Sequence, residues 1–206
     1  MYAKTGEVTL RLTTMAKNES EAEQLLKPLE AKVREVLGEM VYAVGEDNSL
    51  AQTVVELLKQ HNLKVSFAES CTGGLIASKI TNVSGASDVF DCGVVTYSNE
   101  MKEKLLGVPN EMLEKFGAVS KEVAEAMAIG VCKLANSNIG VGVTGIAGPN
   151  GGTPNKPVGL VYIGICGIDG NAEVQEFNLT GGREIIRERT ALYALDMVRR
   201  KIQKNT

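Results

Sequence analysis

The stretch Val65-Ser-Phe-Ala-Glu-Ser-Cys-Thr-Gly-Gly74 joins a short apolar segment to the start of a helix. We expect a strand over 65–68 and a helix over 72–80, with both glycines in the first helical turn. A sharp polar turn between a strand and a helix exposes a side chain at the carboxyl edge of a sheet. Free N–H groups at such a helix start can bind a phosphate or stabilise an oxyanion. The alternative is that Ser70 or Thr72 only caps the helix.

Outward from this stretch, helices alternate with strands along the rest of the chain. The last two expected strands are close in sequence and should pair with each other. The alternation predicts an α/β fold, a mixed β-sheet with helices on both faces. The expected strands are 65–68, 93–96, 139–143, 160–166 and 172–179. The expected helices are 50–61, 72–80, 101–106, 111–116, 120–135 and 183–203.

The first forty-odd residues have a different organisation. Residues 6–14 alternate between polar and apolar side chains and predict a half-buried strand. Ser20-Glu-Ala-Glu23 is a capping box that should open a helix running to Gly38, and Met40–Val44 resembles a second strand. The helix should bury a stripe formed by Leu25, Leu29, Val33 and Leu37. We therefore expect a small β-α-β appendage over residues 1–46 and a main domain over residues 47–206.

Composition excludes several classes of protein. The chain has 206 residues, a net charge of -3 and only 4% aromatic residues, which argues against nucleic acid as a partner. The sequence lacks a signal-peptide pattern and any apolar run of about 20 residues, so we expect a cytoplasmic protein with no membrane partner. Four cysteines without a C-x-x-C pair indicate reduced core residues rather than a zinc site, and no metal is expected.

A serine hydrolase triad does not fit this sequence. Ser70 lacks the G-x-S-x-G pattern, and His61 is the only histidine. His61 should lie at the opposite end of the 65–68 strand, about 15–20 Å from Ser70 by strand rise. A serine nucleophile here would therefore need a lysine or tyrosine as its base.

The segment Thr96-Tyr-Ser-Asn-Glu-Met-Lys102 supplies both candidates at a second strand end. A lysine acts as a base only where burial or a nearby cation lowers its pKa. The alternative is an ordinary solvated helix with Lys102 and Lys104 on its outside.

Two further segments are suited to anion binding. The glycine-rich loop Thr144–Gly159 can bring backbone N–H groups close to a ligand. Gly140–Gly145 formally matches a dinucleotide fingerprint, but its glycines lie within a strand and no helix follows. Arg183 and Arg187 lie one turn apart near a helix start. Positive charges are unfavourable at this end of the helix dipole, so we expect either a bound anion or a surface ion pair beside them.

Taken together and in this order, these segments resemble the C-terminal domain of the CinA family, known as nicotinamide-nucleotide amidohydrolase or NMN deamidase. The resemblance covers about residues 50–204. The N-terminal residues are similar to the second half of the KH-like middle domain of long CinA proteins. The matching stretches are 68–74, Tyr97-Ser-Asn99 with Lys102, 117–120, 145–149, 151–152, 156–159, and Arg183 with Arg187.

The resemblance implies hydrolysis of nicotinamide mononucleotide to nicotinate mononucleotide and ammonia, with no cofactor. Ser70 would attack the carboxamide, Lys102 would accept the serine proton, and Tyr97 would orient the pair or relay the proton. Backbone N–H groups near Cys71–Gly73 would hold the oxyanion, while Arg183 would meet the phosphate. The expected substrate-binding residues are Glu69, Cys71, Thr72, Gly73, Thr144, Gly145, Gly148 and Arg183.

Three alternatives stay open. Cys71 is a rival nucleophile, although neighbouring side chains in a turn point apart and we favour Ser70. The domain could be a non-catalytic nucleotide-binding or competence- and damage-related interaction module, or an amidase for another nucleotide carboxamide. The resemblance also implies a symmetric oligomer, for which a dimer is the commonest form.

Overall fold

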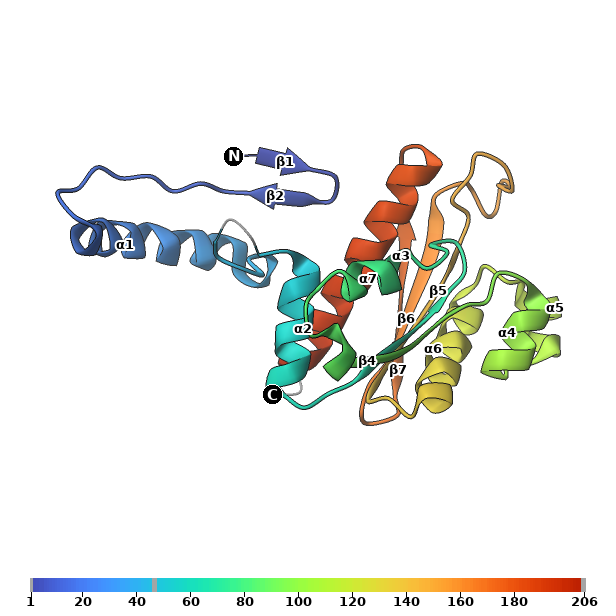
Figure 1. The fold of residues 1–206 in the computed structure, drawn as a ribbon. Coiled ribbons are helices and arrows are strands. Elements are labelled where there is room, and N and C mark those ends of the chain that lie inside the picture. The colour runs from blue at the N-terminus through green and yellow to red at the C-terminus, as the bar shows by residue number, and fades with distance from the viewer. Residues whose placement is uncertain (1, 46–47, 205–206) are drawn as a thin grey trace. The chain divides into compact units, whose positions relative to one another are not determined.

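The computed structural model of this chain describes residues 2–45 and 48–204. The chain divides into two compact units, Met1–Ser49 and Leu50–Thr206. Figure 1 shows the chain as a ribbon, with the second unit built around a single β-sheet.

The second unit is a five-stranded mixed sheet in the order β4-β3-β5-β6-β7. The central β3 pairs in parallel with both β4 and β5, while β6 runs antiparallel to β5 and β7 antiparallel to β6. The expected pairing of the last two strands is therefore confirmed. The strands are β3 (Val65–Glu69), β4 (Phe90–Val95), β5 (Ile139–Gly145), β6 (Leu160–Cys166) and β7 (Ala172–Asn178).

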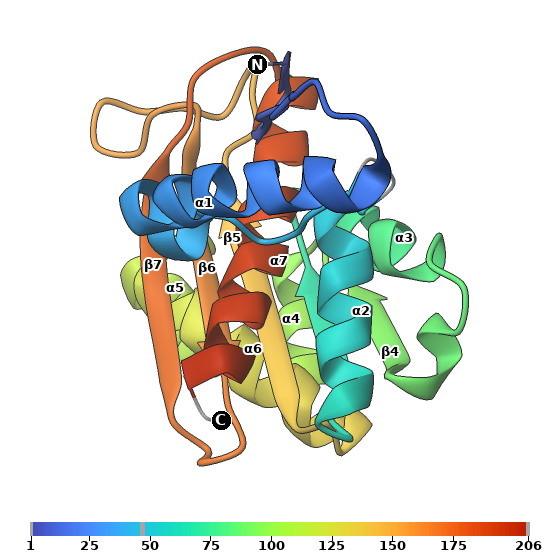
Figure 2. The same ribbon diagram turned by 90° about the vertical axis from the view of Figure 1, so that its left-hand side faces the viewer.

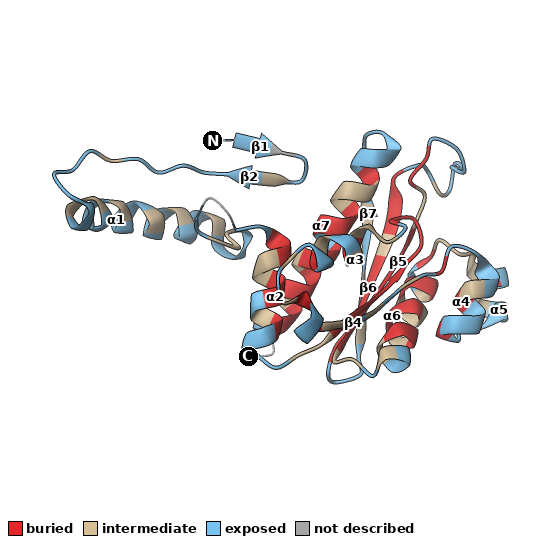
Figure 3. Ribbon diagram, viewed as in Figure 1, coloured by how far each residue is buried: buried red, intermediate tan, exposed pale blue. Residues whose placement is uncertain are grey.

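Helices cover both faces of this sheet, as the sequence predicts. In Figures 1 and 2, α2, α3 and α7 lie over one face, while α4, α5 and α6 lie over the other. Most of the red, buried ribbon in Figure 3 belongs to the sheet, α2, α6 and α7. The helices are α2 (Leu50–Gln60), α3 (Leu75–Thr81), α4 (Asn99–Leu106), α5 (Asn110–Phe116), α6 (Lys121–Ala135) and α7 (Arg183–Lys204), with a 3-10 turn η2 (Ala86–Asp88).

Glycines in β5 and β6 allow α6 to pack close to the backbone of the sheet. A Cβ atom on Gly140 or Gly142 would lie 2.3–2.5 Å from carbonyl oxygens of α6, and one on Gly164 would lie 2.5 Å from the Ala124 oxygen. Real Cβ atoms do not approach backbone atoms this closely, so only glycine fits at these positions. Gly140 and Gly142 of the rejected dinucleotide pattern thus serve helix packing.

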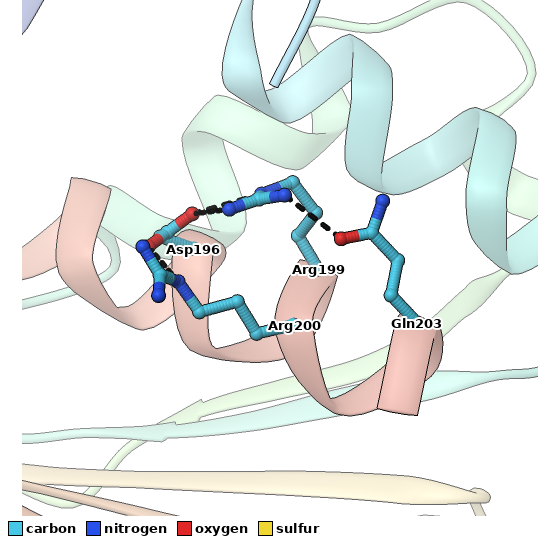
Figure 4. A network of polar contacts seen from close by, with 4 residues as sticks. All are labelled: Asp196, Arg199, Arg200 and Gln203. Carbon is cyan, nitrogen blue, oxygen red and sulfur yellow. Dashed lines mark hydrogen bonds and ion pairs between the residues drawn. The ribbon is translucent and has the colours of Figure 1, made fainter. Parts of the chain in front are cut away.

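The long helix α7 carries a charged network near its C-terminal end. The Asp196 carboxylate accepts hydrogen bonds from Arg199 and Arg200 at 2.7–2.8 Å, and Arg199 also donates to Gln203 at 2.8 Å (Figure 4). Arg199 is only 1% exposed. A guanidinium at such a position must be matched by acceptors, because an unpaired buried charge is strongly destabilising.

The topology brings several helix starts to one edge of the sheet. The carboxyl ends of β3, β4 and β5 share this edge because the three strands are parallel. The connections from β3 lead to α3 on one face, whereas the connection into β5 comes from α6 on the other. Such a change of face is where open α/β sheets bind their ligands, and Ser70 lies there directly after β3.

The first unit contains a hairpin and one helix. Strands β1 (Tyr2–Lys4) and β2 (Glu7–Thr9) pair antiparallel around Gly6, followed by α1 (Glu19–Leu37) and a 3-10 turn η1 (Gly38–Met40). The Tyr42 hydroxyl donates to the Glu7 carboxylate within this unit. Burial and that carboxylate raise the pKa of Tyr42 far above its usual value.

This arrangement corrects several sequence predictions for the appendage. It is β-β-α rather than β-α-β, because Met40–Val44 forms no strand and the strand expected over 6–14 ends at Thr9. Asn18, rather than Ser20, caps α1, by accepting a hydrogen bond from the Glu21 N–H. The expected buried stripe is also wrong, since Leu25 and Leu29 are 46% and 43% exposed.

In the second unit the elements agree with the prediction, apart from their ends. Ser120 caps α6 by accepting from the Val123 N–H at 3.3 Å, as expected. The helix α3 begins at Leu75 rather than at Thr72. Gly73 and Gly74 precede it with φ angles of +61° and +90°, which only glycine adopts without strain. The two glycines therefore shape the turn instead of opening the helix.

Candidate active site

Ser70 and Lys102 lie together at the carboxyl edge of the sheet. The Ser70 N–H donates to the Val143 carbonyl of β5 at 3.0 Å, which fixes the turn after β3. Lys102 extends from α4, and its Nζ atom lies 3.3 Å from Ser70 Oγ. Ser70 is 9% exposed and Lys102 only 1%. The structure therefore rejects the solvated position that was the alternative for Lys102.

Among the described residues, the hydrogen-bond partners of the Lys102 amine are two carbonyl groups and the Ser70 hydroxyl, with no carboxylate. Besides Ser70 Oγ, its Nζ atom contacts the Thr96 carbonyl at 2.8 Å and the Tyr97 carbonyl at 3.5 Å. Burial lowers the pKa of Lys102 below its usual value, and the nearby Cys71 opposes this to a smaller extent. A neutral amine can donate its two hydrogens to the two carbonyls and turn its lone pair toward the serine hydroxyl. This is the arrangement that a general base requires.

Glu69 supports the turn after β3. Its carboxylate is 1% exposed and accepts hydrogen bonds from the N–H groups of Gly74, Ile76 and Ala77 at 2.9–3.2 Å. These N–H groups at the start of α3 have no acceptor within the helix, so the Glu69 carboxylate satisfies them and stabilises the turn. Its expected contact with a substrate stays a prediction, and the geometry makes Glu69 a support of the turn.

Cys71 is buried directly beside Ser70. Burial raises the pKa of the Cys71 thiol to about 12, partly offset by backbone N–H groups. A thiol with this pKa is almost entirely protonated at neutral pH and is a poor nucleophile. This favours Ser70 over Cys71, as the sequence analysis does.

The next residue, Thr72, is held by α7. Arg187 donates from Nη2 to the Thr72 carbonyl at 2.6 Å, and the same nitrogen lies 3.5 Å from the position of a Cβ atom on Gly73. The Gly73 N–H donates to the Ser70 carbonyl at 3.2 Å. The N–H groups of Cys71 and Thr72, which also act on the Cys71 thiol, are the remaining backbone donors for an oxyanion in this turn. Among the described residues, the hydroxyls of Thr72 and Thr96 are buried without a hydrogen-bond partner.

Tyr97 and Arg183 meet at the exposed side of the site. The Tyr97 side chain is 64% exposed, and Arg183 donates to its hydroxyl from Nη2 at 3.3 Å. Arg183 also donates from Nη1 to the Gly148 carbonyl at 2.8 Å. Only the carbonyl of Tyr97 contacts Lys102, so the hydroxyl faces an arginine rather than the Ser70–Lys102 pair. A role of this hydroxyl as proton relay stays a prediction.

The glycine-rich loop is tied to its neighbours partly by Thr144 and Gly145, whose expected contact with a substrate stays a prediction. Thr144 is buried and donates to the Ala118 carbonyl at 2.7 Å, so its hydroxyl is already engaged. Gly145 is the last residue of β5, where a Cβ atom would lie 2.7 Å from Val161. Lys156, which sequence reasoning missed, donates to the Phe116 and Val119 carbonyls at 2.6 and 2.7 Å.

A groove of about 310 Å³ opens beside this loop, under the start of α6. It does not include Ser70 or Lys102. Its lining residues come from the ends of α5 and α6, the loop and the last two strands: Phe116, Val119, Ser120, Lys121, Glu122, Lys156, Tyr162, Val174 and Glu176.

Two kinds of feature bear on function among the described residues: clusters of metal-binding side chains and membrane-spanning helices. Residues 2–45 and 48–204 contain no group of three or more His, Cys, Asp or Glu side chains that could hold a metal ion. Within the same ranges, no helix is both long enough and apolar enough to cross a bilayer.

Comparison with known sequences places both units. Residues 47–202 match the CinA C-terminal domain, and residues 1–43 match the KH domain of damage-inducible protein CinA. A "CinA-like protein" of Kosmotoga olearia is 55% identical over 201 residues, which are 98% of this chain and 48% of that protein. The chain thus spans about half the length of the curated relatives it matches.

Solved structures match the fold of the second unit. The competence/damage inducible protein CihA from Agrobacterium tumefaciens has a TM-score of 0.73 and 42% identity, over 79% of this chain and 100% of that one. A CinA superfamily protein from Klebsiella pneumoniae has a TM-score of 0.73 and 31% identity, over 75% of this chain and 96% of that one.

Proposed function

This chain belongs to the CinA family, and we propose that it hydrolyses the carboxamide of nicotinamide mononucleotide to the carboxylate, releasing ammonia. The observation that carries the proposal is the buried Lys102 amine, 3.3 Å from Ser70 Oγ and bonded to two backbone carbonyls. A buried, carbonyl-bonded lysine beside a serine is suited to acyl transfer without a histidine.

In the first half of the reaction, Ser70 Oγ attacks the carboxamide carbon while the Lys102 amine accepts the hydroxyl proton. The tetrahedral intermediate carries a negative oxygen, for which the N–H groups of Cys71 and Thr72 are the nearest unassigned donors in the turn. Collapse of the intermediate breaks the C–N bond, and the Lys102 ammonium returns its proton to the departing ammonia.

In the second half, water attacks the Ser70 ester. Lys102 again accepts a proton, now from the water, and gives it back to Ser70 Oγ as the carboxylate leaves. The same base thus serves both halves, which requires it to be neutral at the start of each.

The nucleotide phosphate is assigned to Arg183. This side chain is exposed and lies at the start of α7, where its present partners are one carbonyl and the Tyr97 hydroxyl. Neither partner carries a negative charge, so a phosphate would be a stronger acceptor for this guanidinium. In this proposal the Gly148 carbonyl positions the Arg183 side chain.

The test is ammonia release from nicotinamide mononucleotide by the purified chain. Ser70→Ala and Lys102→Met should each abolish turnover, whereas Lys104→Ala should not, because Lys104 lies on the same short helix with its side chain exposed. Full turnover by Lys102→Met would overturn the base assignment. A folded wild-type chain that releases no ammonia would overturn the reaction.

The second candidate is a non-catalytic nucleotide-binding module, in keeping with competence- and damage-related names among the relatives. It predicts binding of the mononucleotide by isothermal calorimetry with no turnover. An amidase for another nucleotide carboxamide would instead be found with a panel of carboxamide substrates. A cytoplasmic location, a homodimer and the lack of a nucleic-acid partner stay predictions.

A further inference from the structure

Two of the four cysteines approach each other at the end of the sheet opposite Ser70. Cys166 is the last residue of β6 and lies directly across from Gly140 of β5 in the antiparallel register. Directly opposed residues of an antiparallel pair have Cβ positions about 4.5–5.5 Å apart on the same face. Cys132, near the end of α6, has its Cβ atom 2.6 Å from the position of a Cβ atom on Gly140. The absent side chain of Gly140 therefore leaves room for both cysteines.

Both cysteines are free thiols in this structure, and the Cys166 thiol donates to the Gly167 carbonyl at 3.8 Å. Cys132 is half-buried, and its thiol donates to the Ser137 carbonyl at 2.9 Å. Cys166 is 4% exposed. Burial, and to a lesser extent Cys132, raises the pKa of the Cys166 thiol to about 11. Cys132 is therefore the more accessible of the two to a reagent in solvent, whereas Cys166 is buried.

From this juxtaposition we propose that Cys132 and Cys166 are a redox modification site, in which a reversible disulfide joins the end of α6 to the end of β6. A disulfide needs Cβ atoms about 3.5–4.5 Å apart. The Cβ atoms of Cys132 and Cys166 both border the vacant side-chain position of Gly140, and rotation about the two Cα–Cβ bonds can then bring the sulfur atoms together. The other two cysteines, Cys71 and Cys92, lie on β3–α3 and β4 and take no part.

The chemistry requires an external oxidant, which we take to be a low-molecular-weight disulfide. The Cys132 thiolate attacks one sulfur of that disulfide and releases one small thiol, leaving a mixed disulfide on Cys132. The Cys166 thiolate then attacks the Cys132 sulfur and releases the second small thiol. Two protein thiols are oxidised and one small disulfide is reduced to two thiols, so electrons and protons balance.

The proposal does not depend on the proposed function. The pair lies across from Gly140 at the beginning of β5, whereas Ser70 bonds to Val143 near the other end of that strand. Bond formation should therefore leave deamidation unchanged. It should stabilise the fold, because it closes a loop from residue 132 to residue 166 in the unfolded chain.

The experiment incubates the chain with oxidised glutathione, blocks free thiols by alkylation and maps tryptic peptides by mass spectrometry. We expect peptide 122–133 joined to peptide 134–183, each of which contains one of the two cysteines. The second step should quicken about tenfold per pH unit between pH 7 and 9, because the thiolate fraction of Cys166 rises with pH below its pKa. Oxidation should raise Tm by on the order of 5 °C or more.

Matched variants separate this pair from incidental oxidation. Cys92→Ser should form the same linked peptides and show the same rise in Tm, whereas Cys132→Ser should form none. Cys166→Ala should stop at the glutathione adduct of Cys132, which also shows that Cys132 reacts first. A wild-type chain that keeps this adduct without ever forming the linked peptides would overturn the proposal, as would links from Cys132 to Cys92 instead.

Discussion

At the scale of single residues, Lys102 shows what the sequence can and cannot predict. Tyr97, Lys102 and Ser70 could be selected from strand ends and family resemblance, but the burial of Lys102 could not. Lys102 and Leu106, four residues apart, are the buried residues of α4, a helix that is only eight residues long. Such a short helix has too few turns for periodicity to distinguish a buried lysine from a solvated one.

The depressed pKa of Lys102 predicts how activity depends on pH. Only the neutral amine can accept the serine proton, so kcat/KM should rise with pH through the lowered pKa and then level off below 10.5, the usual lysine value. Lys102→Arg should lose activity by roughly 10²-fold or more at every pH, because a guanidinium stays protonated. The measurement is a pH–rate profile of ammonia release, and a flat profile for the wild-type chain would contradict it.

The same pKa shift predicts a pH dependence of stability. The unfolded chain binds the Lys102 proton more tightly than the folded one, so the free energy of unfolding should rise with pH between the folded pKa and 10.5. Lys102→Met removes this titration, and its urea-unfolding curve should lack that part of the rise. Equal slopes for wild type and Lys102→Met over this window would show that Lys102 is not the group responsible.

Cys71 provides a test of which neighbour is the nucleophile. With a pKa of about 12, roughly one thiol in 10⁴ is ionised at pH 8, so iodoacetamide should modify Cys71 slowly. Cys71→Ala should keep most of its turnover, whereas Ser70→Ala should lose it. Rapid labelling of Cys71 that tracks loss of ammonia release, together with an active Ser70→Ala variant, would exchange the two assignments.

At the scale of helices and strands, local sequence patterns predicted an element correctly where a neighbouring strand or helix was available for pairing or packing. The apolar run Met40–Val44 has strand-like composition, yet no neighbouring strand accepts its hydrogen bonds and it forms none. The expected long strand over 6–14 is shortened to Glu7–Thr9, because Gly6, with φ of +80°, lies in the hairpin turn and the pairing with the short β1 extends only to Thr9. By contrast, every strand expected after residue 60 is present in the five-stranded sheet.

The glycines beneath α6 give the sharpest prediction at this scale. Gly142→Ala would place its Cβ atom 2.5 Å from backbone atoms of Ala124 and Ala128, so α6 must move away from the sheet. The expected cost is about 3 kcal/mol, or a fall in Tm on the order of 10 °C. Gly182→Ala is the matched control, because a Cβ atom there meets nothing within 4 Å. Equal melting temperatures for both variants would refute the packing argument.

At the scale of the whole molecule, the edge that carries the site follows from the strand order. Alternating helices and strands predicted a mixed sheet, but only the structure shows β3 between β4 and β5. That order places the ends of three parallel strands and the starts of α3, α4, α6 and α7 at one edge. Strand order depends on contacts between residues far apart in sequence, which periodicity does not report.

The division into two units predicts where stability and activity reside. Among the described residues every buried side chain lies at Leu50 or later, as do Ser70, Lys102 and Arg183. Removing residues 2–44 should therefore leave Tm within about 2 °C and ammonia release within about twofold of the full chain, because the core and the site are built from residues of the second unit. The comparison needs both chains at equal concentration, since an oligomer would make Tm depend on it. A shortened chain that unfolds, or that folds but loses turnover, would contradict this prediction and show that the second unit needs the first.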